Sequence, residues 1–69
     1  MPPMKIALYE RPAGEYHFSL PGRLVEADLK DGFQVKEGRF GELLIFGEPG
    51  TIGMTLDRAI EMGAVRLPK

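Results

Sequence analysis

The sequence predicts a single α+β domain over residues 1–69, built from a small β-meander of about five strands, one short C-terminal helix and a last short strand. Apolar and polar residues alternate at period two through most of the chain before residue 47, which is typical of half-buried strands. A helical period occurs only once, near the C-terminus. Because one helix of about two turns cannot cover a large sheet, we expect the sheet to curl into a half-barrel or to pair with a second chain.

Two strands are expected before residue 21. Residues 5–9 have strand character, and turn residues at 11–14 end that strand. Residues 15–20 alternate cleanly and predict a half-buried strand, whose apolar face carries Tyr16, Phe18 and Leu20. Pro21 and Gly22 suit a type II turn, whose twist does not match a tight two-residue hairpin. We therefore expect a looser connection there, or two strands that separate.

The third and fourth strands are predicted on either side of a short turn. Residues 24–30 alternate again, with an inward face made of Val25, Ala27 and Leu29. Asp31 and Gly32 are the strongest hairpin signal in the chain, because both central residues of a type I′ turn have positive φ. The sequence therefore predicts a hairpin that joins residues 24–30 to a strand at 33–36.

The last part of the chain predicts a buried strand and then the helix. Residues 40–46 form the fifth strand, and their apolar run at 43–46 is typical of a central strand covered on both faces. Thr55 is a good N-cap, and Gly63 is the expected left-handed residue after the helix. The apolar stripe between these two caps consists of Leu56, Ala59 and Ile60. Residues 64–67 could add a last short strand.

Composition limits the classes of protein to consider. Nine Lys and Arg residues against ten Asp and Glu residues give a net charge of −1, and the charges are interspersed. This pattern argues against a strong sequence-independent grip on DNA or RNA, which needs clustered positive charge. No apolar run approaches the length of a membrane span, and no signal-peptide pattern is visible at the start. The chain has no cysteine, no asparagine and one glutamine, a composition that suits a cytoplasmic protein of a heat-adapted prokaryote.

The size of the chain predicts an oligomer. A domain of this length buries only about 60% of the surface that its unfolded chain exposes. Without cysteine, neither disulfides nor thiolate-bound metals can add stability. We therefore expect a homodimer, the commonest closed assembly, and leave room for a different protein partner.

A loop with three glycines before the helix is the one local hint of a binding site. Unpaired backbone N–H groups at a helix start attract anions, and glycines allow a close approach. The candidate residues for an anion or small ligand are Gly47, Gly50, Thr51, Gly53, Thr55 and Arg58. The spacing matches neither the G-x-G-x-x-G pattern nor the Walker pattern, and Glu48 would repel a phosphate. Turn geometry is therefore the favoured explanation of these glycines.

Two other groups of residues could form a site. Arg23, Lys36 and Arg39, interleaved with aromatic residues, could form a small nucleic-acid-binding face, although core packing explains most of the aromatics better. His17 shares a predicted strand face with Glu15 and Ser19, but neighbours on one face of a strand lie about 6.6 Å apart along the backbone. We therefore predict no catalytic residue, no metal site and no cofactor.

The sequence alone favours a non-enzymatic interaction module that dimerises through an apolar sheet face or edge. The alternative is a nucleic-acid or anion binder that uses the glycine loop or the basic face. An enzyme ranks third, because a pocket in so small a domain would have to form between subunits. Fold-level analogy cannot choose among these functions.

Overall fold

The computed structural model describes residues 4–47 and 52–68, which form two antiparallel sheets and one helix. β1 (Met4–Glu10) and β3 (Arg23–Leu29) make the longest ladder. The two-residue strands β2 (Tyr16–His17) and β6 (Val65–Arg66) complete this sheet in the order β2-β1-β3-β6. The inward face that the sequence predicts for β3 is confirmed, since Val25, Ala27 and Leu29 are all buried.

The second sheet is a hairpin of β4 (Phe33–Glu37) and β5 (Leu43–Gly47). On the far side of β5, Ile45 and Met54 exchange two backbone hydrogen bonds, with N···O distances of 2.9 and 2.8 Å. β5 is therefore flanked by β4 on one edge and by the segment before the helix on the other.

The helix α1 (Leu56–Met62) begins and ends where the sequence predicts. The Thr55 hydroxyl oxygen accepts a hydrogen bond from the backbone N–H of Arg58 at 3.2 Å. Gly63 has φ of 87°, a left-handed conformation that glycine adopts without strain, and its N–H returns to carbonyl groups of the last turn. Both caps are local features, which is why the sequence pattern identifies them.

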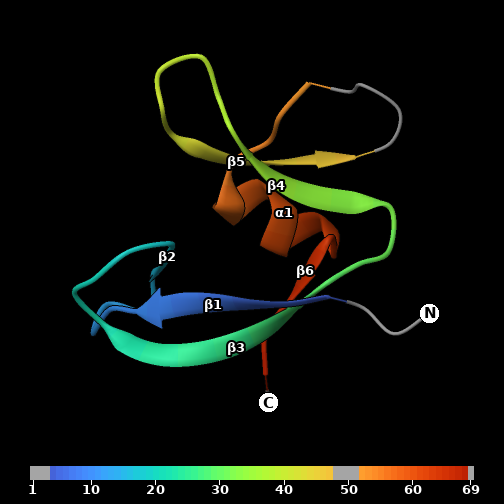
Figure 1. Ribbon diagram of the computed structural model, residues 1–69. Helices are drawn as coiled ribbons and strands as arrows, with labels where there is room; N and C mark the ends of the chain where they lie inside the picture. The colour runs from blue at the N-terminus through green and yellow to red at the C-terminus, as the bar shows by residue number, and fades with distance from the viewer. Residues whose placement is uncertain (1–3, 48–51, 69) are drawn as a thin grey trace.

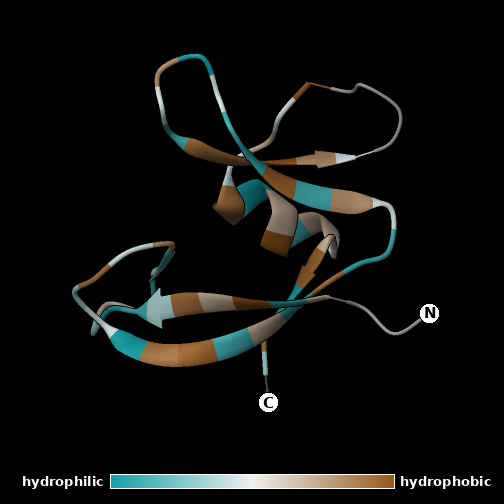
Figure 2. Cartoon of the chain, in the orientation of Figure 1, coloured by the Kyte–Doolittle hydropathy of each residue, from teal (hydrophilic) through white to brown (hydrophobic). Residues whose placement is uncertain are grey.

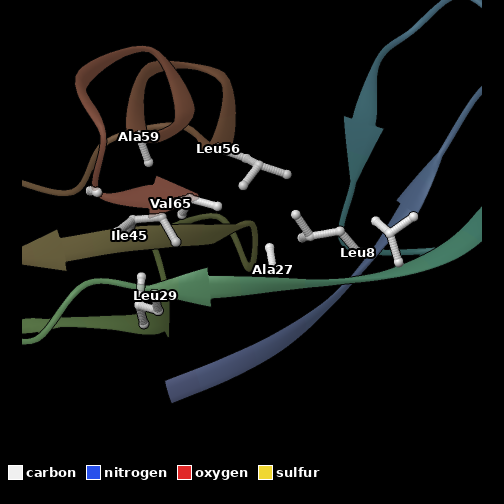
Figure 3. Close-up of a cluster of buried hydrophobic side chains, with 9 residues drawn as sticks. Leu8, Ala27, Leu29, Ile45, Leu56, Ala59 and Val65 are labelled. Atoms are coloured by element: carbon white, nitrogen blue, oxygen red, sulfur yellow. The ribbon is translucent and has the colours of Figure 1, made fainter. Parts of the chain in front are cut away.

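In Figure 1, α1 is seen between the β1–β3 ladder and the β4–β5 hairpin, and it contacts β2 and β6 of one sheet and β5 of the other. Colouring by hydropathy shows teal and brown segments along β3, which alternate residue by residue from Val25 to Leu29 (Figure 2). One apolar cluster joins both sheets to the helix (Figure 3). The members buried most completely are Leu8, Ala27, Leu29, Ile45, Ala59, Ala64 and Val65. The α+β class is thus confirmed at the coarse level of a mostly β fold with one short helix and a curled half-barrel sheet.

The predicted hairpin at Asp31 and Gly32 is corrected by the structure. A turn forms there, since the N–H of Phe33 donates to the Lys30 carbonyl at 3.1 Å and Gly32 has φ of 92°, but it is not of type I′, because Asp31 does not have positive φ. In addition, β3 and β4 enter different sheets. The physical reason is that β6 already occupies this edge of β3: Leu29 pairs with Val65, and the Lys30 N–H donates to Ala64.

Two predicted strands are shorter than the sequence pattern indicates. In the segment 15–20 only Tyr16 and His17 pair with β1, while the Arg11 guanidinium donates to the Ser19 carbonyl at 3.1 Å. Of the two alternatives expected at Pro21, the structure shows separated strands, because β1 lies between β2 and β3. The fifth strand starts at Leu43 instead of residue 40, since residues 38–42 form a loop closed by a hydrogen bond from Gly38 N–H to the Glu42 carbonyl.

Candidate functional site

The glycine loop is explained in part by packing. Gly50 and Thr51 lie outside the described residues, and Gly47 ends β5. A Cβ at Gly53 would lie 2.7 Å from Cζ and 2.9 Å from Cε1 of the Phe46 ring, and 3.0 Å from a methyl group of Leu44. Carbon atoms in contact are normally about 3.5–4.0 Å apart. A side chain at residue 53 would therefore force the Phe46 ring, the Leu44 side chain or the loop to shift.

The two remaining members of the predicted anion site have partners within the chain. The Thr55 hydroxyl caps the helix, as described above, and the Arg58 guanidinium lies 2.7 Å from a carboxylate oxygen of Glu61. Thr55 thus acts as the N-cap, and Arg58 pairs with a residue one turn later in the same helix. Anion binding by this loop stays a prediction.

The three predicted basic residues do not form one face. Arg23 lies at the start of β3 and pairs with Glu10, whereas Lys36 belongs to β4 and Arg39 to the β4–β5 loop in the other sheet. The Lys36 ammonium lies over the Phe46 ring, 6.0 Å from its centroid. Lys36 and Arg39 thus share one hairpin, and Arg23 is separated from them.

The ion pair at Arg23 changes the acidity of its neighbours. The hydrogen bond from Arg23 lowers the pKa of Glu10 below its usual value of 4.5, and a second hydrogen bond from the Tyr16 hydroxyl, at 3.2 Å, acts in the same direction. Desolvation raises the pKa of Tyr16 above 10.0, and the Glu10 carboxylate adds to that effect. Glu10 is therefore the centre of a small polar cluster that ties β1, β2 and β3 together.

His17 lies in an open groove of about 250 Å³ between β2, the β4–β5 loop and the helix start. Its Nε2 is 3.2 Å from a carboxylate oxygen of Glu15, while Glu42 and Asp57 line the same groove. Among residues 4–47 and 52–68, no three His, Asp or Glu side chains are grouped as metal ligands would be. No helix in these ranges is long and apolar enough to cross a bilayer.

Large apolar side chains are exposed at several places on the surface. Phe40, at the tip of the β4–β5 loop, is 86% exposed, and Ile52 is 92% exposed. The others are Met4, Leu20, Leu24, Leu43 and Met62. The exposure of Phe40 was not predicted, because the sequence pattern includes this residue in a strand at 40–46. Gly38 and Gly41, on either side of Phe40, were a signal for a loop.

The outer edge of β4 is open in the described part of the chain. Antiparallel residues direct their N–H and C=O groups to the same side, and those of Ile45 point to Met54. Val35, which is opposite Ile45, must therefore direct its own N–H and C=O away from β5. By the same alternation, the backbone groups of Glu37 and the carbonyl of Phe33 face outward. The edge presents a row of hydrogen-bonding groups without a strand beside them.

No protein-family model, curated protein or solved structure matches this chain. The geometry is therefore the basis for the functional conclusion. Three features are available for that conclusion: an open strand edge at β4, exposed apolar side chains on several elements, and a polar cluster around Glu10 that links β1, β2 and β3.

Proposed function

We propose that this protein is a non-enzymatic interaction module that acts as a homodimer. One observation carries the proposal: seven large apolar side chains are exposed in the described part of the chain, Phe40 and Ile52 almost completely. A domain of this length has a small core, and these side chains are apolar surface that a second copy of the chain can cover.

The chemistry of the exposed surface supports the same proposal. Interfaces are enriched in aromatic residues and methionine, and their cores are depleted of charge. Phe40, Met4 and Met62 are exposed side chains of these kinds. Large apolar residues on a small domain leave water when a second copy covers them, which offsets the limited core of one chain.

The test is the mass of the protein in solution as a function of concentration. Sedimentation equilibrium of the full chain from micromolar to millimolar concentration should give twice the 7.7 kDa mass of one chain, with a reversible midpoint. A mass of one chain across the whole range would overturn the proposal. Raising the salt concentration separates the driving forces, because apolar association persists in salt while ionic association weakens.

A second candidate function is the binding of single-stranded nucleic acid by the β4–β5 hairpin. The specific observation in its favour is Phe40, which is almost fully exposed and adjoins Arg39 in a loop near Lys36. Proteins that bind single strands stack bases on aromatic rings beside positive charges.

Fluorescence anisotropy with a labelled oligonucleotide at low salt tests the second candidate. Binding that weakens steeply with salt, and that Phe40→Ser reduces while Ile52→Ser does not, would support it. Ile52→Ser is the matched control because it also removes a highly exposed apolar side chain, at a position outside the hairpin. No anisotropy change at low salt would remove this candidate.

A further inference from the structure

We infer that two copies of the chain join through their β4 edges, with Val35 of one copy directly opposite Val35 of the other. This inference rests on the proposed dimer and specifies where and in which register it forms. The two hairpins would then make one four-stranded antiparallel sheet in the order β5-β4-β4-β5 across a two-fold axis.

The backbone of β4 is arranged for this contact. Val35 and Glu37 direct both of their backbone hydrogen-bonding groups to the open edge, as does the carbonyl of Phe33. With the axis at Val35, the two valines exchange a pair of N–H···O=C bonds. Each Glu37 N–H then donates to the Phe33 carbonyl of the other copy. The Phe33 N–H is not needed, because it is already used in the turn with Lys30.

The side chains also favour this register over its neighbours. Centring the pair on Val35 places Lys36 opposite Gln34 of the other copy, with no like charges in contact. Centring it on Lys36 would put two ammonium groups opposite each other. Centring it on Gln34 would set Asp31 against Glu37. Like charges directly opposite each other destabilise a strand pair.

The packing of the hairpin leaves room for a partner. Phe33 and Val35 are only partly buried against the core, so a second β4 would extend the apolar layer beneath them. A lysine on an edge strand commonly guards against such pairing. Here the Lys36 ammonium lies over the Phe46 ring of the neighbouring strand β5, which holds it on the side away from the open edge.

Disulfide trapping tests the register, and the chain is suited to it because it contains no cysteine. Gln34 and Lys36 direct their backbone groups to β5, so across the β4–β4 contact they form pairs without hydrogen bonds, in which side chains approach most closely. The separation of the Cβ atoms in such pairs is close to that of a disulfide. The variants are Gln34→Cys and Lys36→Cys, both at exposed positions.

The two variants are mixed in equal amounts under reducing conditions, exchanged and then oxidised. After random exchange, about half of the dimers contain one chain of each variant. Only these mixed dimers place one cysteine opposite the other, so about half of the chains should be trapped as a disulfide dimer. Each variant oxidised alone should yield only a small fraction of that amount. Circular dichroism of the reduced variants verifies that both are folded.

The outcomes separate the two proposals. A wild-type dimer by sedimentation, together with selective trapping in the mixture, supports the register. A wild-type dimer without the mixed disulfide, or with equal trapping of either variant alone, overturns the β4 contact and leaves the dimer in place. A wild-type monomer overturns the proposed dimer, and the β4 contact with it.

Discussion

Replacing Gly53 with alanine tests whether this glycine serves packing or a ligand. The backbone at Gly53 does not have positive φ, so alanine can adopt it without strain. The added methyl group would lie 2.7 Å from Phe46 Cζ, and the ring or the loop must move by about 1 Å to restore normal contact. The substitution therefore acts through a contact between two named side chains.

The magnitude follows from two opposing effects. Overpacking of this kind costs about 1–3 kcal/mol. Replacing glycine by alanine also restricts the unfolded chain, which stabilises the folded state by about 0.4–1 kcal/mol. We expect Gly53→Ala to lower the free energy of unfolding by about 1–2 kcal/mol, against a total of roughly 3–10 kcal/mol for a chain of this length. The melting temperature should fall by about 4–8 °C per kcal/mol.

Urea unfolding of four proteins provides the assay: wild type, Gly53→Ala, Phe46→Leu and the double variant. Leucine lacks the Cε1 and Cζ atoms that meet the new methyl group, so Gly53→Ala should cost clearly less in that background, where the remaining close contact is the Leu44 methyl group at 3.0 Å. The denaturant dependence should be the same in all four, since the surface exposed on unfolding is nearly unchanged. Two results would refute the reasoning: Gly53→Ala as stable as wild type, or an equal cost in both backgrounds.

Three further predictions concern the core, the helix cap and pH. Ile45 is fully buried where β5 meets the segment before the helix. The protein should lose about 2–5 kcal/mol of unfolding free energy in Ile45→Ala and about 0.5–1.5 kcal/mol in Ile45→Val, and equal losses in urea unfolding would contradict this account. Thr55→Ala should cost about 1 kcal/mol while Thr55→Ser retains the cap, and thermal melts that rank serine with alanine would argue against it. The pKa of Glu10 is lower in the folded protein than in the unfolded chain, so the unfolded chain takes up the proton first as pH falls. The stability that Glu10 contributes is thus present above about pH 4.5 and lost below it. The unfolding free energies of wild type and Glu10→Gln should therefore converge in acid. A difference between the two proteins that stays constant with pH would contradict this account.

Local features of this protein could be predicted from the sequence because their hydrogen bonds join residues close along the chain. The Thr55 and Gly63 caps and the turn at Gly32 each use groups within five residues of one another. Alternation also assigned Val25, Ala27 and Leu29 to the inner face, since side chains of a strand point to opposite faces in turn. These elements carry the α+β class and the position of the helix.

The partners of each strand could not be predicted in the same way. Residues 65–66 occupy the edge of β3 that a hairpin at Gly32 would have given to β4, and they come more than thirty positions later in the chain. That long-range pairing sends β4 into a second sheet. The open edge of β4 is a consequence of this pairing between β3 and β6. If β4 had paired with β3 as well as with β5, its backbone groups would be occupied and could not bind a partner strand.

The sequence by itself determined the helix caps, the position of the turn at Gly32 and the inner face of β3, because these depend on side-chain periodicity and on local backbone geometry. Only the tertiary structure decided that Gly53 packs under Phe46, that Arg23 is paired with Glu10 away from Lys36, and that β4 has an open edge. Each of these features depends on which segments of the chain meet in space. The residues of one strand do not by themselves specify which other strand will pair with it.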